Sequence, residues 1–209
     1  MMDITKALDW RYAVNEFSQQ KLNQDQVSVL LDATRKSASS YGLQPYKLLL
    51  VESPSLRERL VPHSFGQQKV LHSSHLVVIA AQSSIGDATV DKYVSQYLKV
   101  REVQYSDIAG YAEHMKEALG KKTLQQKREW AHQQAYLALG TLLAAAAELR
   151  IDSCPMTGFD ATAYDEILGL KGLGLETTAI VALGFRSEND TSASLPKVRF
   201  DYEDIVKVL

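Results

Sequence analysis

The sequence predicts a single α+β domain in which several helices cover a small sheet, and three observations indicate this class. Apolar residues at helical spacing dominate the chain, only three short apolar runs are typical of strands, and helices and strands do not alternate regularly. At 209 residues and 45% hydrophobic, the chain can bury a substantial core. We therefore expect one domain over residues 1–209, with helices layered on a sheet in an αβα arrangement.

Helix-start signals and short apolar runs define the elements of the first half. Asn23 is the expected N-cap of a helix whose inner face carries Val27, Leu30, Leu31 and Thr34 at helical spacing. Ser53 followed by Pro54 is typical of another helix start. In order, we expect a helix at 3–10, the helix after Asn23, a strand at 47–51, the helix after Ser53, a short helix at 67–73 and a strand at 76–81.

The second half is mostly helical, and one of its helices is unusually long. Residues 123–150 predict a helix of about 42 Å, at ~1.5 Å per residue. Its segment 135–147 is apolar on nearly every face but shorter than the ~20 residues of a membrane span, so we expect it in a core or a subunit interface. The other expected elements are helices at 87–104, 106–119 and 160–168, a third strand at 177–185 and a tail at 187–209.

Charge and cysteine content restrict the partners and the compartment. The 23 basic and 25 acidic residues give a net charge of −2, so neither nucleic acid nor an anionic membrane is an expected partner. Cys154 is the only cysteine, which excludes an internal disulfide and fits a reducing compartment. The N-terminal residues lack the continuous apolar core of a secretion signal. We therefore expect a cytoplasmic protein.

The motifs of several common enzyme classes are missing from the sequence. The strand at 47–51 is followed by Glu-Ser-Pro-Ser rather than by the GxGxxG of a dinucleotide fold. The chain contains no GxxxxGK[ST], GxSxG, HExxH or CxxC motif. His72 and His75 have HxxH spacing, but no third ligand accompanies them, and we expect no metal site.

Three segments that are rich in polar or charged residues are candidates for binding. The first is RYAVN at 11–15, the second is SASSYGLQPYK at 37–47, and the third is LPKVR at 195–199. The proline after Gln44 predicts an extended conformation for that residue. Each segment also has a simpler interpretation: an arginine that pairs with Asp9 or Glu16, a polar turn, and a solvated basic tail.

Taken together and in order, five segments resemble the nitroreductase family of FMN-dependent oxidoreductases. They are RYAVNEF, SASSYGLQPYK, GQQKVLHSSHLVV, SCPMTGF and PKVR, and the resemblance runs from about residue 3 to residue 199. It implies a layered αβα fold with a central, mostly antiparallel sheet. It also implies a homodimer, with the long helix buried at the interface.

The resemblance also implies a set of cofactor-binding residues. Arg11, Lys197 and Arg199 match the family's phosphate contacts, and Lys69 matches a lysine at the flavin edge that gains negative charge on reduction. The turn at 155–158 matches the segment that faces flavin N5, and the Ser-rich stretch would contact the flavin of the other subunit. The full implied set is Arg11, Tyr12, Ala13, Asn15, Ser39, Tyr41, Gln44, Gln67, Lys69, Pro155, Met156, Thr157, Gly158, Lys197 and Arg199.

Two positions depart from the family pattern. Asn15 stands where relatives often carry a second cation, which predicts a lower reduction potential for the bound flavin. Thr157 stands where many relatives carry Glu. The family contact at this position runs through the main chain, so threonine preserves it, whereas a role of the carboxylate in nicotinamide binding does not carry over.

The implied activity needs no catalytic side chain, because the flavin accepts and delivers the hydride itself. With FMN as cofactor and NADH or NADPH as co-substrate, we expect a ping-pong cycle that reduces nitroaromatics, quinones or similar flat electrophiles. One alternative is a narrower reductase for an enone, a pteridine or a halogenated aromatic. Two others are a non-catalytic FMN-binding protein and a purely structural helical dimer.

Overall fold

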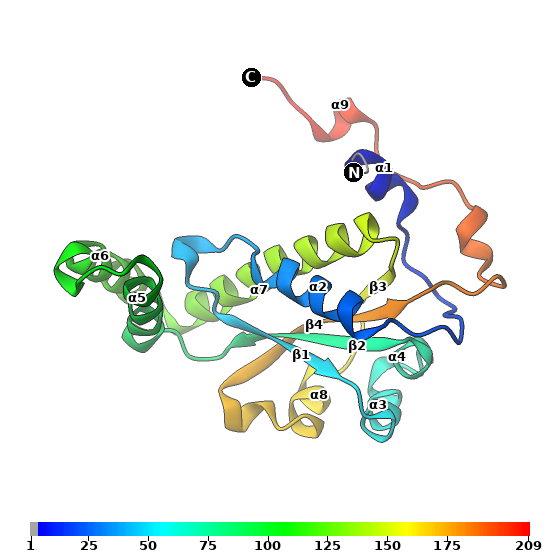
Figure 1. The fold of residues 1–209 in the computed structure, drawn as a ribbon, viewed down its shortest axis with the longest axis horizontal. Coiled ribbons are helices and arrows are strands. Elements are labelled where there is room, and N and C mark those ends of the chain that lie inside the picture. Colours follow the sequence, from blue (N-terminus) through cyan, green and yellow to red (C-terminus); the bar gives the residue numbers. More distant parts are fainter. Residues whose placement is uncertain (1–3) are drawn as a thin grey trace.

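The computed structural model describes residues 4–209 and shows a four-stranded sheet between layers of helices (Figure 1). The strand order is β1-β2-β4-β3, and every neighbouring pair is antiparallel. The strands are β1 (Tyr46–Val51), β2 (His75–Gln82), β3 (Asp152–Met156) and β4 (Leu175–Gly184). The predicted α+β class and the antiparallel sheet that the family resemblance implies are therefore confirmed.

Helices cover both faces of the sheet. In Figure 1, α2 and α7 lie on one face, α3, α4 and α8 lie on the other, and α5 and α6 project beyond one end of the sheet. The helices are α1 (Ile4–Trp10), α2 (Gln24–Arg35), α3 (Pro54–Leu60), α4 (Lys69–His72), α5 (Asp87–Arg101), α6 (Ala109–Gly120), α7 (Leu124–Glu148), α8 (Ala161–Ile167) and α9 (Tyr202–Ile205). The first helix was expected from residue 3, which lies outside the described residues.

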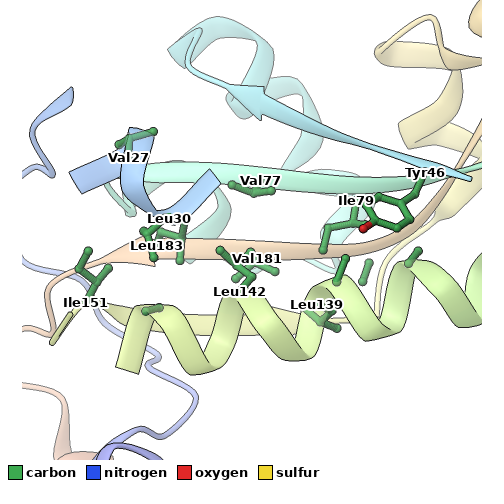
Figure 2. Close-up of a cluster of buried hydrophobic side chains, with 14 of the residues drawn as sticks. Val27, Leu30, Tyr46, Val77, Ile79, Leu139, Leu142, Ile151, Val181 and Leu183 are labelled. Atoms are coloured by element: carbon green, nitrogen blue, oxygen red, sulfur yellow. The ribbon is translucent and has the colours of Figure 1, made fainter. Parts of the chain in front are cut away.

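The core follows the two-residue periodicity of the strands. In β2, Val77 and Ile79 pack against α2 and α7, together with Leu139 and Leu142 of α7 (Figure 2). The intervening β2 residues join a second cluster, which lies on the face that carries α3, α4 and α8. Since successive side chains of a strand point to opposite faces, one apolar run supplies both clusters.

The long helix α7 matches its prediction to within two residues at each end. Thr123 Oγ1 accepts a hydrogen bond from the Gln126 N–H (3.2 Å), and the Gln126 side chain accepts one from the Thr123 N–H (2.9 Å), so a capping box starts the helix. One face of α7 covers the sheet, while Tyr136 and Leu137 on another face are 47% and 51% exposed. No helix within residues 4–209 has both the length and the apolar composition needed to cross a membrane.

The prediction of only three strands is wrong, because Asp152–Met156 forms β3. Pro155 and Met156 were assigned to a turn but lie in this strand, and only Thr157 and Gly158 of the expected turn follow it. Proline removes one ladder hydrogen bond and argues against a central strand, but it is tolerated at a sheet edge, where β3 lies. A five-residue strand that contains proline has no clear periodic signal.

Candidate functional site

The N-terminal segment after α1 runs along the β3 edge of the sheet. The Val14 N–H donates to the Ser153 carbonyl (3.5 Å), and the Ser18 N–H donates to the Phe185 carbonyl (2.8 Å). An isolated parallel bridge joins Ala13 to Ser153. Residues near the N-terminus are thereby placed beside β3 and the end of β4.

Arg186, which follows β4, holds the residues on either side of Arg11. Its guanidinium carbon lies 4.5 Å from the Trp10 ring centroid and 4.6 Å from the Tyr12 ring centroid. Asp152 fixes Arg186 in turn, with 2.6 Å between Nη2 and Oδ1. Burial raises the pKa of Tyr12 to about 12, so its ring stays neutral beside this pair. The backbone that carries Arg11 is thus fixed on both sides.

Three cations line a cavity of about 420 Å³ between the end of α1 and the C-terminal tail. They are Arg11, Lys197 and Arg199. Within the described residues, Arg11 forms no ion pair with Asp9 or Glu16, and its buried Nε has no hydrogen-bond partner. Burial lowers the pKa of Arg11, and the positive charge of Arg199 lowers it further. Asp9 is the one carboxylate of residues 4–209 that also lines the cavity, so three positive charges face a single negative one. An excess of positive charge around a cavity is the arrangement that binds an anion.

Lys197 and Arg199 also contact the backbone. The Lys197 ammonium donates to the carbonyl oxygens of Leu8 and Arg11, the latter at 2.6 Å, and so caps the C-terminal end of α1. Arg199 Nη1 donates to the carbonyl of its neighbour Val198 (2.6 Å). Lys197 therefore fixes the backbone of Arg11 in addition to contributing charge to the cavity.

Lys69, the first residue of α4, reaches the same edge of the sheet. Its ammonium donates to Asn15 Oδ1 (2.8 Å) and lies 3.5 Å from Cys154 Sγ. Burial raises the pKa of the Cys154 thiol and the Lys69 charge lowers it only in part, so the thiol is neutral at pH 7. The sequence provided no independent signal for Cys154 at this site, although it lies inside the segment SCPMTGF.

The turn after β3 packs against the loop that precedes α4. Gln67 Nε2 donates to the Gly158 carbonyl (3.2 Å), and Phe65 would lie 3.9 Å from a Cβ atom at Gly158. Phe65 is 74% exposed and has a φ of 53°, which is unusual for a bulky residue and is more often found at functional sites. Phe65 was not among the residues predicted from the sequence, where its only signal is an aromatic residue before Gly66 in a polar loop.

The prediction of an extended Gln44 is wrong, because its φ is 44°. Its N–H donates to Ser39 Oγ (3.1 Å), and its side-chain amide donates to the Arg35 carbonyl (2.7 Å). The Tyr46 N–H then bonds the Gln44 carbonyl (2.8 Å) and closes a tight turn around Pro45. Proline disfavours the right-handed helical region for the preceding residue, which still leaves positive φ accessible when hydrogen bonds hold it.

Ser39, Tyr41 and Gln44 do not join the other predicted site residues within one chain. They lie just before β1, whereas Arg11 and Lys69 lie beside β3, at the opposite edge of the sheet. The Ser40 N–H donates to Gln134 Oε1 of α7 (2.8 Å), which holds this turn against the long helix. The structure therefore divides the predicted site residues into two groups.

Gly42 should not tolerate a side chain, and its replacement provides a test of the Ser-rich turn. Its φ is +73°, and a Cβ atom there would lie 3.0 Å from Tyr93 Cε2. We expect Gly42→Ala to lower the free energy of unfolding by about 1–2 kcal/mol. Gly110→Ala is the matched control, because Gly110 lies in α6 with open space around it, and alanine favours the helix. Equal stability of both variants in urea denaturation would contradict this account of the turn.

The histidine pair does not extend into a metal site in the described part of the chain. His72 ends α4, and His75 opens β2 one residue before the strand predicted at 76–81. Within residues 4–209, no three His, Cys, Asp or Glu side chains are arranged to hold a metal ion.

The fold and the site define an α+β protein with a cation-lined cavity between the end of α1 and the C-terminal tail, and with a lysine that Asn15 holds at the β3 edge of the sheet. Residues 8–185 match the model of the Nitroreductase family, and the chain belongs to that family. YfkO of Bacillus subtilis strain 168, a protein named as a candidate NAD(P)H nitroreductase, is 32% identical over 216 residues, which cover 98% of this chain and 96% of YfkO.

Solved structures have the same fold. One is a candidate NAD(P)H:FMN oxidoreductase from Staphylococcus epidermidis, with a TM-score of 0.87 and 17% identity, covering 100% of this chain and 97% of that one. Another is a candidate nitroreductase from Exiguobacterium sibiricum 255-15 in complex with FMN, with a TM-score of 0.85 and 16% identity, covering 100% and 98% of the two chains.

Proposed function

We propose that the protein is an FMN-dependent oxidoreductase that uses NADH or NADPH to reduce flat electrophiles such as nitroaromatics and quinones. The observation that carries this proposal is the grouping of Arg11, Lys197 and Arg199 around one cavity, with the buried Arg11 Nε left without a partner. The names of its relatives support the nicotinamide donor, and the FMN complex of a structural neighbour supports the cofactor.

The residues present fit FMN. A phosphate group would supply the hydrogen-bond acceptor that Arg11 Nε lacks, and it would compensate the positive charge that remains beside Asp9 around the cavity. Lys69 would lie against the part of the ring that becomes negative on reduction, and Asn15 would orient the lysine. The turn at Thr157 and Gly158 would present main-chain groups to the ring.

When bound, FMN supplies the hydride chemistry, so the chain has only to bind, orient and shield the reactants. The exposed ring of Phe65 offers an apolar surface on which a flat molecule can stack. We expect donor and acceptor to occupy one place in turn. Double-reciprocal plots of the steady-state rate against donor concentration, recorded at several acceptor concentrations, should then give parallel lines. Intersecting lines would contradict a shared binding place.

We also propose a homodimer in which the Ser-rich turn of one chain completes the site of the other. Two observations support it. Ser39, Tyr41 and Gln44 lie at the edge of the sheet opposite Arg11, and the exposed face of α7 carries the apolar side chains Tyr136 and Leu137 beside Gly140. An exposed apolar helix face with a small residue allows close approach of a second helix.

Leu137→Glu tests the dimer. A buried carboxylate in the interface is costly to desolvate, so the variant should sediment as the 23.3 kDa chain while the wild type sediments as twice that mass. Leu173→Glu is the control, since Leu173 is 66% exposed in the turn Leu170–Leu173, which lies between α8 and β4 in the chain. A wild type that sediments as a single chain would contradict the proposed dimer. A Leu137→Glu variant that keeps the mass of a wild-type dimer would exclude this face of α7 as the dimer interface.

The proposal includes a reducing, cytoplasmic location. Cys154 is a free, buried thiol, and it is the only cysteine in the sequence. A chain with no possible internal disulfide fits a compartment that keeps thiols reduced. Fractionation of the native cells with an antibody to the protein is the direct test.

A further inference from the structure

Asp190 is a buried carboxylate for which the site described above has no role. It is 5% exposed and lies directly before the short helical turn Thr191–Ser194. Its Oδ2 accepts hydrogen bonds from the N–H groups of Asn15 (2.8 Å) and Glu16 (3.1 Å), and its Oδ1 accepts one from the Ser192 N–H (3.0 Å). Among the described residues Asp190 forms no ion pair within 4.0 Å, and backbone N–H groups provide these three hydrogen bonds, while the Ser192 side chain and the charge of Arg186 also act on it.

These bonds join two segments from opposite ends of the chain. Asn15 lies four residues after Arg11, and Ser192 lies five residues before Lys197. Asn15 Nδ2 also donates to Ser192 Oγ (3.4 Å), which adds a weaker side-chain link. The carboxylate of Asp190 therefore lies where the two halves of the cation-lined cavity meet.

The same carboxylate is linked to Lys69 through one residue. Asp190 holds the backbone of Asn15, and the Asn15 side chain accepts the hydrogen bond from the Lys69 ammonium. Burial alone would raise the pKa of Asp190, but the N–H groups of Glu16, Asn15 and Ser192 lower it below its usual value. The group is thus ionised at neutral pH, and an ionised acceptor makes stronger hydrogen bonds than a neutral one.

We propose that Asp190 is a positioning residue that sets Arg11 against Lys197 and Arg199 and, through Asn15, orients Lys69. This inference rests on the proposed function, because it assumes that the cavity binds the FMN phosphate. A residue that only stabilised the fold would weaken the binding of every flavin equally. A residue that aligns the phosphate contacts acts mainly on FMN, and riboflavin, which lacks the phosphate, loses only the smaller effect that passes through Asn15 to Lys69.

The experiment measures Kd for FMN and for riboflavin by fluorescence titration, together with thermal stability. For Asp190→Ala we expect Kd for FMN to rise by about tenfold, which corresponds to about 1.4 kcal/mol, and Kd for riboflavin to rise by less than about threefold. Asp190→Asn keeps the shape and one acceptor oxygen, so it should fold and show a smaller loss in the same direction.

Asp165→Ala is the matched control. Asp165 is also buried, at 8% exposed, and accepts bonds from the Thr177 N–H (2.8 Å) and hydroxyl (2.6 Å), away from the cavity. It should lose stability but keep the wild-type ratio of the two Kd values.

Three outcomes would overturn the inference. If the wild type prefers FMN and both Asp190 variants keep that preference, the positioning role is refuted while the proposed phosphate site stands. The same holds if Asp165→Ala loses the preference to the same extent as the Asp190 variants. If the wild type binds both flavins equally, the proposed phosphate site fails and the positioning role fails with it.

Discussion

Arg11→Ala is expected to raise Kd for FMN by about 100-fold and to leave Kd for riboflavin within about threefold of the wild type. The guanidinium is partly buried at the cavity, and its Nε lacks a partner, so a phosphate would be bound by charge-assisted hydrogen bonds. Arg11→Lys keeps the charge but loses the planar fork, and an intermediate loss is expected. Fluorescence titration with both flavins measures the effect.

Arg59→Ala is the control for this experiment, because Arg59 is an exposed residue of α3, whereas Arg11 lines the cavity beside the end of α1. Its two Kd values should match those of the wild type. Loss of FMN and riboflavin binding to the same extent in Arg11→Ala would show that the arginine supports the fold instead of binding the phosphate.

Lys69→Met is expected to lower the reduction potential of the bound flavin by roughly 30–60 mV. A charge-assisted hydrogen bond contributes about 1.5–3 kcal/mol, and for a two-electron couple about 1.4 kcal/mol corresponds to 30 mV. The ammonium is held beside the site by Asn15 Oδ1 at 2.8 Å, and its charge favours the reduced flavin over the oxidised form. A dye-linked anaerobic redox titration measures the potential.

Asn15→Lys tests the same electrostatic effect in the opposite direction. It adds a cation where the chain has a neutral amide, so its potential should lie above that of the wild type. Lys171→Met is the control for Lys69→Met and should keep the wild-type potential, because Lys171 is exposed and pairs with Glu166 on another part of the surface. A wild-type potential equal to or above that of Asn15→Lys would contradict the role assigned to charge at this position.

The elements that the sequence predicts well have strong periodicity and clear caps. The helix α7 has a capping box at Thr123 and Gln126, and β2 and β4 contain the apolar runs LVVIAA and AIVAL. β3 was missed because its stability comes from pairing with β4, which lies further along the chain. The conformation of Gln44 was predicted incorrectly because it depends on hydrogen bonds to Ser39 and Arg35.

The site could be predicted only where ordered motifs pointed to it. Arg11, Lys197 and Arg199 come from three positions that only a family resemblance connects, and the structure brings them to one cavity. Asp190 could not be found in this way, since it bonds backbone N–H groups 174 and 175 residues earlier in the chain. An isolated aspartate in a polar tail usually indicates a solvated loop.

The most direct test of the FMN-dependent activity is the visible absorbance spectrum of the purified protein under anaerobic conditions. The spectrum is recorded after incubation with FMN and removal of the free cofactor, and again after adding NADH or NADPH. We expect flavin bands that bleach with at least one donor. A protein that retains no FMN, or whose flavin bands do not change with either donor, would contradict the proposed activity.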